Sequence, residues 1–311
     1  MRAVGQRVFG GPEVLQEIEL ERPEAAAGEI VVRVRAAGVN PTDWKHRAGL
    51  TGRPTPVPVL GWDVSGTVAQ VGSGVTLFAP GDDVFGMLPY PRRPGGYAEY
   101  ATAPTRSFTR VPANLDHVGA AALPLAALTA HQALVDTADL QPGQRVLVHA
   151  AAGGVGHLAV QLAKARGAHV IGTAGAAKHD LLRRLGADEL IDYRTTAFDA
   201  VLDGIDVVLD TLAGDVRTRS LEVLRPGGIL VSLVADGTEP AAARRAAARG
   251  VRMAGLMVEA DHAGMRAVAA LVEQGELRPH IAATFPLADA AAAHALGERG
   301  RTTGKIVLTV D

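Results

Sequence analysis

The 311-residue chain contains no cysteine, and this absence removes several kinds of chemistry. It excludes disulfide bonds, thiolate catalysis and every zinc site that uses cysteine ligands. The chain also lacks a Gly-x-Ser-x-Gly nucleophile turn, a Walker loop and a His-Glu-x-x-His zinc motif. Hydrolase and phosphotransferase functions therefore have no motif in their favour.

A large excess of one charge and a long apolar run are also missing. Lysine and arginine total 31 against 33 acidic residues, a formal net charge of -2 that creates no general attraction for nucleic acid or an anionic membrane. No apolar run at the start has signal-peptide length, and none elsewhere is long enough to cross a bilayer. With 48% hydrophobic and 21% charged residues, we expect a soluble, cytoplasmic globular protein without a nucleic-acid or membrane partner.

The spacing of apolar residues changes at about residue 120. Before it, glycine and proline separate valine-rich runs at 29–36, 63–71 and 83–88, which indicates strands and tight turns. After it, strands and helices alternate, which indicates a doubly wound parallel sheet. Strands are expected at 146–149, 170–173, 190–192, 207–210, 229–234 and 251–257, and helices at 178–185, 216–224, 240–249 and 265–272. Three glycines are expected to form left-handed helix caps: Gly167, Gly186 and Gly227.

We therefore expect two domains. Residues 1–122 and 275–311 form the turn-rich β domain, which a strand at 305–310 closes. Residues 123–274 form the domain in which strands and helices alternate.

A glycine-rich turn within residues 145–165 is the most informative segment, because a strand pattern precedes it and a helix pattern follows it. Gly153 and Gly156 let the backbone approach a phosphate, whose charge is met by unpaired N–H groups and the positive end of the helix dipole. Ala151 stands where the usual G-x-G-x-x-G has its first glycine, which leaves A-x-x-G-x-x-G from Ala150. A turn without a ligand is the alternative, but the flanking elements favour a nucleotide site.

Ten short motifs then appear in order along nearly the whole chain. They are AAGVNPTD at 36–43, LGWDVSGTV at 60–68, VGSG at 71–74, PGDDVFG at 80–86, GGYAEY at 95–100, ALTA at 127–130, LGAD at 185–188, DYR at 192–194, LRPGG at 224–228 and GKIV at 304–307. Together they resemble the medium-chain dehydrogenase/reductase superfamily, and specifically its zinc-free, zeta-crystallin-like NADPH:quinone oxidoreductase branch.

This resemblance implies an α/β protein with a GroES-like, β-barrel-type catalytic domain, a Rossmann cofactor domain and an active cleft between them. In zinc-dependent relatives the residues after Gly61 would read His-Glu, whereas here they are Trp62 and Asp63. Since cysteine ligands are also missing, we expect no catalytic metal.

The choice of nicotinamide cofactor depends on the charge near the second strand of this domain. An NAD site places an acidic residue about 20 residues past the glycine turn, where it binds the ribose. This strand instead ends in the uncharged Thr173-Ala-Gly175, and Lys178 follows. Since an ammonium attracts a 2′-phosphate, NADPH is favoured.

The resemblance also assigns cofactor contacts residue by residue. Lys178 and Tyr193 match positions that touch the 2′-phosphate, although Lys178 could simply begin a solvated helix and Tyr193 could cap the core. The other expected cofactor-binding residues are Asn40, Thr129, Ala152, Gly153, Gly154, Val155, Gly156, Thr173, Leu212, Leu233, Val234 and Lys305.

Candidate catalytic residues are Asn40 and Lys45, which could donate hydrogen bonds or a proton. Asp43 and the aromatic residues Trp44, Trp62 and Tyr90 are expected to form the substrate pocket, since a flat acceptor can stack on aromatic walls. Related quinone reductases often carry tyrosine where Lys45 stands, and Lys45 could equally form a structural ion pair with Asp43 or Asp63.

The favoured function is hydride transfer from NADPH to a quinone or another conjugated carbonyl, because such acceptors stabilise negative charge without a metal. Two alternatives remain open: an enoyl-thioester reductase, and a non-catalytic NADPH-binding sensor or structural protein. The apolar strand at 251–257 is expected at the edge of the sheet, where it could pair two copies into a homodimer.

Overall fold

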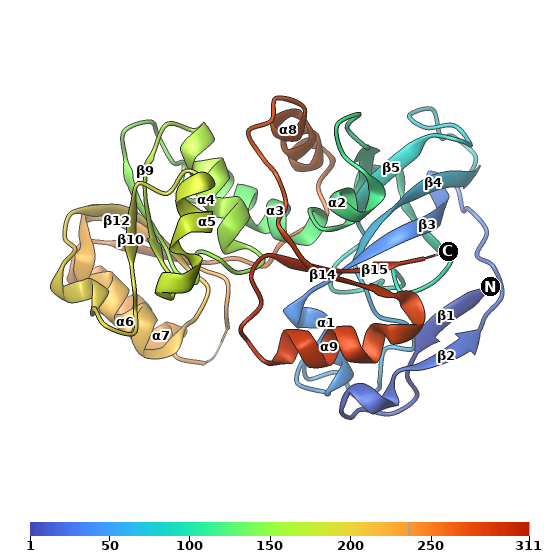
Figure 1. Ribbon diagram of the computed structural model, residues 1–311, viewed down its shortest axis with the longest axis horizontal. Coiled ribbons are helices and arrows are strands. Elements are labelled where there is room, and N and C mark those ends of the chain that lie inside the picture. The colour runs from blue at the N-terminus through green and yellow to red at the C-terminus, as the bar shows by residue number, and fades with distance from the viewer. Residues whose placement is uncertain (236, 311) are drawn as a thin grey trace. The chain divides into compact units, whose positions relative to one another are not determined.

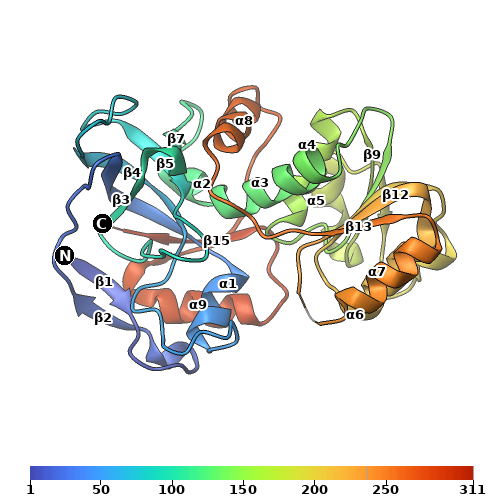
Figure 2. The same cartoon turned by 180° about the vertical axis from the view of Figure 1, so that it is seen from behind.

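The computed structural model describes residues 1–235 and 237–310, and the chain divides into two compact units. Met1–Leu128 and Glu259–Asp311 form the first unit, and Thr129–Val258 forms the second. The change from the first to the second unit falls inside helix α3 (Pro124–His131), which is labelled in Figures 1 and 2. Among the described residues, no helix combines the length and apolarity needed to cross a membrane.

The second unit contains a six-stranded sheet in which every neighbouring pair is parallel. Its spatial order is β10-β9-β8-β11-β12-β13, so the strand order reverses between β8 and β11. The strands are β8 (Arg145–Val148), β9 (His169–Thr173), β10 (Glu189–Ile191), β11 (Ile205–Asp210), β12 (Leu224–Ser232) and β13 (Arg252–Gly255). This is the strand order of the Rossmann fold, in which ligands bind beyond the carboxyl ends of the strands at the reversal. The predicted doubly wound sheet is confirmed.

Helices α4 (Gly156–Ala165), α5 (His179–Arg184), α6 (Gly214–Val223) and α7 (Glu239–Ala248) connect these strands. Gly167 and Gly186 follow α4 and α5 with φ of 76° and 102°, so the left-handed caps predicted there are confirmed. Gly227 also has a positive φ, of 79°, but the prediction of a helix cap is wrong, because α6 ends at Val223 and Gly227 lies within β12.

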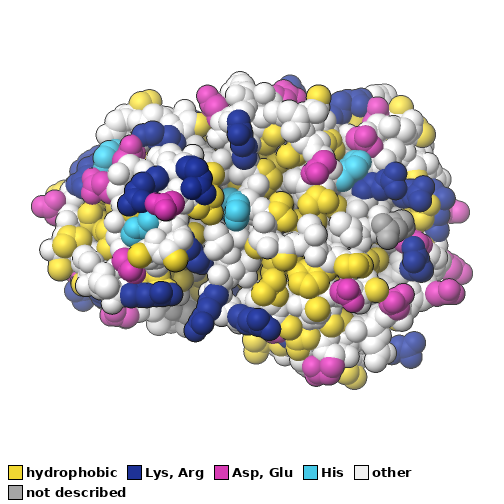
Figure 3. Space-filling model, viewed as in Figure 1, with side chains coloured by type: hydrophobic (Ala, Val, Ile, Leu, Met, Phe, Trp, Pro, Cys, Tyr) yellow, Lys and Arg dark blue, Asp and Glu magenta, His cyan; other side chains and the backbone are white. Residues whose placement is uncertain are grey.

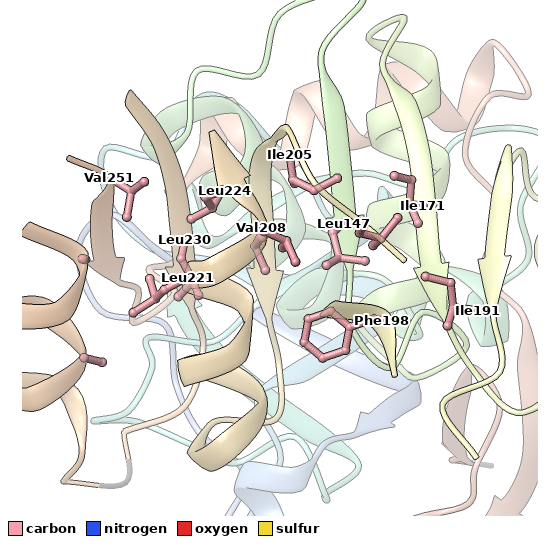
Figure 4. Packing of buried hydrophobic residues seen from close by; sticks show 14 residues of the cluster. Leu147, Ile171, Ile191, Phe198, Ile205, Val208, Leu221, Leu224, Leu230 and Val251 are labelled. Carbon is pink, nitrogen blue, oxygen red and sulfur yellow. The ribbon is translucent and has the colours of Figure 1, made fainter. Parts of the chain in front are cut away.

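Branched and aromatic side chains between the sheet and α6 form the core of the second unit. Figure 4 shows Leu147, Ile171, Val208 and Leu230, one from each of four neighbouring strands, with Leu221 of α6 in the same cluster. In helix α4 every residue from Gly156 to Ala163 is buried, and not only the one face that its spacing predicted. The core therefore holds the carboxyl ends of β8, β9, β11 and β12 in fixed positions.

The first unit is built on a mixed seven-stranded sheet with the path β14-β15-β3-β4-β5-β7, in which β6 pairs with β3. Its strands are β3 (Glu29–Val39), β4 (Asp63–Val71), β5 (Asp83–Met87), β6 (Tyr100–Pro104), β7 (Phe108–Arg110), β14 (Ile281–Pro286) and β15 (Lys305–Thr309); β1 (Arg2–Gly5) and β2 (Gln16–Glu19) form a separate pair. The strands expected at 29–36, 63–71, 83–88 and 305–310 are all present.

Helices α1 (Pro41–Arg47), α2 (His117–Ala121), α8 (His262–Glu273) and α9 (Ala290–Glu298) complete the first unit. α2 packs on β3 and β4, α9 packs on α1, and α8 packs on β7. Because of that last contact, residues 259–274 belong to the first unit, although the sequence pattern assigned them to the alternating domain. On the face shown in Figure 3, basic and acidic side chains are interspersed.

Candidate functional site

The glycine turn joins β8 to α4 and presents unpaired backbone donors. Among the described residues, the N–H groups of Gly154, Val155 and Gly156 have no hydrogen-bond acceptor, while that of Gly153 is bonded to the Ala150 carbonyl at 2.8 Å. These three groups stand at the N-terminus of the ten-residue helix α4. Consecutive free N–H groups at a helix N-terminus form an anion site, since the helix dipole adds to their partial positive charge.

Close packing explains which positions of the turn need glycine. A Cβ on Gly156 would lie 2.4 Å from the Ala150 oxygen, so no larger residue fits without moving the backbone. Ala151 replaces the first glycine of the usual motif, and the neighbouring strand makes room for it, because a Cβ on Gly172 of β9 would lie 2.9 Å from the Ala151 Cβ. The glycine missing from the turn is thus compensated on the next strand.

Two cationic residues and a tyrosine lie near the ends of β9 and β10. Lys178 is half-buried before α5, and Tyr193 follows β10 with 61% of its surface exposed. Arg194, which sequence reasoning missed, lies over the Tyr193 ring at 5.7 Å and within 3.3 Å of the position that a Cβ on Gly175 would take. The adjacent Asp192 carboxylate accepts backbone N–H groups from Ala176 at 3.3 Å and Arg194 at 3.0 Å. This corner therefore exposes the Arg194 guanidinium, while the adjacent Asp192 carboxylate is engaged by backbone N–H groups.

The loops after β11 and β12 carry the remaining candidates of the second unit. Leu212 is 51% exposed, and Leu233 and Val234 are half-buried. The Thr211 hydroxyl donates to the His149 carbonyl at 3.0 Å, and the Leu233 N–H donates to the Asp210 carbonyl at 2.9 Å. These bonds tie the ends of β8, β11 and β12 to one another.

Thr173 and His149 form a buried polar link between β9, β8 and α6. The Thr173 hydroxyl lies 3.1 Å from His149 Nδ1, and His149 Nε2 lies 2.8 Å from the Ser220 hydroxyl. Burial lowers the pKa of His149 to about 4, so the ring is neutral. Thr129 is also buried, and it lies on α3, which precedes the glycine turn in the sequence.

In the first unit, Asn40 is held by Lys305 and Asp63. The Asn40 amide donates to Asp63 Oδ2 at 2.8 Å and its oxygen accepts from Lys305 Nζ. The Lys305 ammonium also reaches the Val39 carbonyl at 3.2 Å and Asp63 Oδ2 at 3.3 Å, so its three hydrogens are matched by three acceptors. Lys305, only 3% exposed, thus fixes the Asn40 side chain.

A second buried chain of hydrogen bonds leads from Asp43 to α9. The Tyr97 hydroxyl donates to Asp43 Oδ2 at 3.1 Å and lies 3.0 Å from His294 Nε2. Arg47 donates to His294 Nδ1 at 3.2 Å and pairs with Glu298 at 2.6 Å. Because Arg47 can only donate, His294 Nδ1 accepts and its Nε2–H donates to Tyr97.

Burial controls the protonation of this chain. It raises the pKa of Asp43 to about 7, with the charge of Asp63 acting in the same direction. It lowers the pKa of His294 to about 3, and the neighbouring Arg47 charge adds to this effect. Within the described residues, Asp43 Oδ1 has no hydrogen-bond partner. Asp43 is therefore a carboxyl group that changes charge near neutral pH inside the protein.

The aromatic candidates of the first unit differ in exposure. Trp62 is fully buried, with its ring centroid 4.8 Å from His46 and 5.3 Å from Tyr90. Trp44 is half-buried against α9, where a Cβ on Gly297 would lie 2.6 Å from its ring. Tyr90 is half-buried, and its hydroxyl lies 3.2 Å from that of Thr42.

Lys45 is exposed on α1, and the described residues contain no ion pair between it and Asp43 or Asp63. The alternative of a structural pair is thus not observed. With Asp43 and Trp62 fully buried, Lys45, Tyr90 and Trp44 are the candidates of this unit that reach its surface.

Two family models match the chain. Residues 26–113 match the alcohol dehydrogenase GroES-like domain, and residues 185–308 match the zinc-binding dehydrogenase family. The chain is 33% identical to the human quinone oxidoreductase, and the match covers 99% of this chain and 97% of the human protein. The chain belongs to the medium-chain dehydrogenase/reductase superfamily. Its predicted fold, a GroES-like domain and a Rossmann domain, is confirmed.

Solved structures of this superfamily resemble the chain over its whole length. The Escherichia coli quinone oxidoreductase in complex with NADPH has a TM-score of 0.89 and 30% identity, covering 99% of this chain and 100% of the other. The CurK enoyl reductase has a TM-score of 0.91 and 26% identity, covering 100% and 99%. The chain is thus a quinone oxidoreductase-like member of the superfamily.

Polyketide synthases are also among the relatives. The spectinabilin polyketide synthase protein NorB of Streptomyces orinoci is 39% identical over 97% of this chain, but the match covers 14% of NorB. The chain spans 5% to 14% of the length of the first three such relatives.

The zinc named in one family description does not fit the residues present here. At the position where zinc-dependent relatives carry ligands, Trp62 has no metal-binding atom and Asp63 is occupied by Asn40, Lys305 and the Leu125 N–H. The chain also has no cysteine, and the residues that the structure describes contain no group of three metal-binding side chains. These residues therefore do not fit a zinc ion at this position.

Proposed function

We propose that this chain is an NADPH-dependent reductase that transfers a hydride to a quinone or to another conjugated carbonyl compound. The observation that carries the proposal is the set of three unpaired N–H groups at residues 154–156. They suit a pyrophosphate, because charge-assisted hydrogen bonds to a helix N-terminus stabilise phosphate oxygens. The complex of the E. coli relative with NADPH supports the same cofactor.

The preference for the phosphorylated cofactor rests on the corner formed by Lys178, Tyr193 and Arg194. Two cations near the end of β9 attract a 2′-phosphate, and a guanidinium can bind two phosphate oxygens at once. The Asp192 carboxylate nearby accepts the backbone N–H groups of Ala176 and Arg194, which link the loops after β9 and β10.

Bound NADPH supplies the hydride. The chain's own residues are proposed to bind the cofactor, to orient the acceptor and to protonate it. Gly154, Val155 and Gly156 bind the pyrophosphate, while Thr129, Leu233 and Val234 line the nicotinamide. Asn40 is only 2% exposed and is held in one orientation by Lys305 and Asp63, and we propose that its second amide hydrogen donates to the acceptor's carbonyl oxygen. Lys45 is an exposed donor of the first unit that can stabilise an enolate or hydroquinone oxygen and return a proton.

The acceptor is proposed to be conjugated because the described residues contain no group of three metal-binding side chains that could hold an ion to polarise a simple ketone. A quinone delocalises the added electron pair itself, and an enone does so as an enolate that needs one hydrogen-bond donor. Trp44 and Tyr90 present aromatic surface on which a flat acceptor can stack.

The test follows NADPH absorbance in the presence of a small quinone, an enone and a saturated ketone. We expect oxidation of NADPH with the quinone and the enone and none with the ketone. Absence of turnover with every conjugated acceptor, together with tight NADPH binding, would instead support a sensor or structural role.

A second candidate is reduction of an enoyl thioester, which the similarity to polyketide synthases and to the CurK enoyl reductase favours. The discriminating measurement compares an enoyl-CoA with the free enone of the same chain length. A kcat/KM that is higher for the thioester by more than tenfold, about 1.4 kcal/mol of transition-state binding, would make this the better assignment.

A further inference from the structure

A buried ion pair in the second unit joins both loops that follow β11 and β12. Arg217 on α6 and Asp210 at the end of β11 have no exposed side-chain surface, and Arg217 Nε lies 2.9 Å from Asp210 Oδ2. Breaking a buried pair leaves an uncompensated charge, so such a pair persists only where its surroundings satisfy both partners. The groups that form hydrogen bonds with Asp210 and Arg217 belong to the two loops.

Asp210 holds the first loop. Its Oδ1 atom accepts the N–H groups of Leu212 at 3.0 Å and Ala213 at 2.8 Å. Ala213 has φ of 65° and ψ of −163°, a conformation that is nearly exclusive to glycine and is strained for other residues. The carboxylate therefore maintains a strained turn next to the exposed Leu212.

Arg217 holds the second loop. Its Nη2 atom donates to the Val234 carbonyl at 2.5 Å and to the Ser232 hydroxyl at 2.9 Å, and its Nη1 atom donates to the Thr238 hydroxyl at 3.0 Å. The Ser232 hydroxyl lies 2.9 Å from Asp210 Oδ2, which closes the network between the two strand ends. One guanidinium thus fixes the path of residues 232–234 and reaches the start of α7.

We propose that the Asp210–Arg217 pair is a positioning element that sets the shape of the two loops, 211–214 and 233–235, against which the nicotinamide half of the cofactor binds. This inference rests on the proposed function for the identity of the ligand. Neither side chain touches the cofactor, since both are completely buried. Both act through the backbone of Leu212, Leu233 and Val234.

Arg217→Lys is the decisive variant, because an ammonium keeps the charge next to Asp210 but cannot reach Val234, Ser232 and Thr238 together. The probes are NADPH and 2′,5′-ADP, which lacks the nicotinamide half. We expect the Kd for NADPH to rise about tenfold, as for loss of charged hydrogen bonds, and the Kd for 2′,5′-ADP to stay within about twofold. Equal changes for the two ligands, or none, would overturn the inference.

Arg219→Lys is the matched control on the same helix, since Arg219 pairs with Asp199 and Asp215 outside both loops. We expect it to leave both Kd values unchanged. If Arg217→Lys does not fold, Ser232→Ala keeps the ion pair and removes only the bridging hydroxyl, and it should weaken NADPH binding in the same selective way.

Hydrogen exchange of the ligand-free protein separates this inference from the proposed function. The amides of Leu212, Ala213 and Leu233 should exchange faster in Arg217→Lys than in the wild type, while those of the core strands should not. A wild type that binds neither probe would refute the proposed function, and the exchange data would still decide whether the pair holds the loops. Faster amide exchange in only one of the two loops, or throughout the second unit, would overturn the inference about the Asp210–Arg217 pair.

Discussion

Asp43→Asn tests whether a buried carboxyl group changes its charge near neutral pH. Burial raises the pKa of Asp43 from 3.8 to about 7, so the folded protein holds a proton that the unfolded chain releases at lower pH. Between pH 4 and 7 the folded state therefore binds more protons, and the free energy of unfolding falls as pH rises. At about 1.4 kcal/mol per pKa unit, the loss attributable to Asp43 is about 4 kcal/mol and is complete just above pH 7.

The two buried histidines have the opposite effect. Burial lowers the pKa of His149 to about 4 and that of His294 to about 3, so both gain protons on unfolding below pH 6.5 and stability falls with decreasing pH there. Both histidines are present in the wild type and in Asp43→Asn. The contribution of Asp43 is therefore the difference between their free energies of unfolding at each pH.

The assay is urea unfolding at pH values from 4 to 8.5. Asparagine is a neutral replacement for the protonated carboxyl and can still accept from Asn40 N–H and Tyr97. We expect the variant to become more stable relative to wild type as pH rises, by about 4 kcal/mol across the range. Asp180→Asn, at a side chain that is 85% exposed, is the control and should show no such trend. Parallel curves for wild type and Asp43→Asn would refute the reasoning.

Three further predictions concern stability, cofactor binding and assembly. Ala213→Gly should raise the free energy of unfolding by about 1 kcal/mol in thermal or urea denaturation, because glycine adopts the positive φ without strain; a loss of stability would contradict this. Gly156→Val should abolish NADPH binding in calorimetry while the protein stays folded, since the added Cβ displaces the Ala150 carbonyl; unchanged affinity would remove the turn from the site. Light scattering should give a dimer formed through the edge strand β13. Met257→Arg, at a residue that is 66% exposed, should give a monomer. A monomeric wild type would disprove the pairing.

Much of the second unit could be predicted from local pattern. Each parallel strand carries a short apolar run and each crossover helix follows at regular spacing, so the elements and the glycine turn were identifiable individually. The misplaced cap at Gly227 shows the limit of this reasoning, because a positive φ in glycine also occurs within an irregular strand. Helix α8 shows another limit, since its apolar spacing does not tell which sheet it packs on.

The polar networks could not be predicted in the same way. Tyr97 and His294 are 197 residues apart in sequence, and only the fold brings them to 3.0 Å. Arg217 lies in a helical pattern where arginine usually faces solvent, and its burial depends on acceptors from two other segments, at Asp210 and at residues 232–234. Arg194 had a local signal, since it directly follows Tyr193, but its position beside Gly175 required the structure.

The most direct test of the proposed cofactor site is a titration of the wild type and of the Lys178→Ala, Arg194→Ala double variant with NADPH and NADH. We expect the wild type to bind NADPH roughly ten- to a hundredfold more tightly, as for one or two hydrogen bonds to a charged group. The double variant should bind the two cofactors about equally, through a weaker affinity for NADPH alone. Equal or tighter binding of NADH by the wild type, or a preference that persists in the variant, would contradict the account.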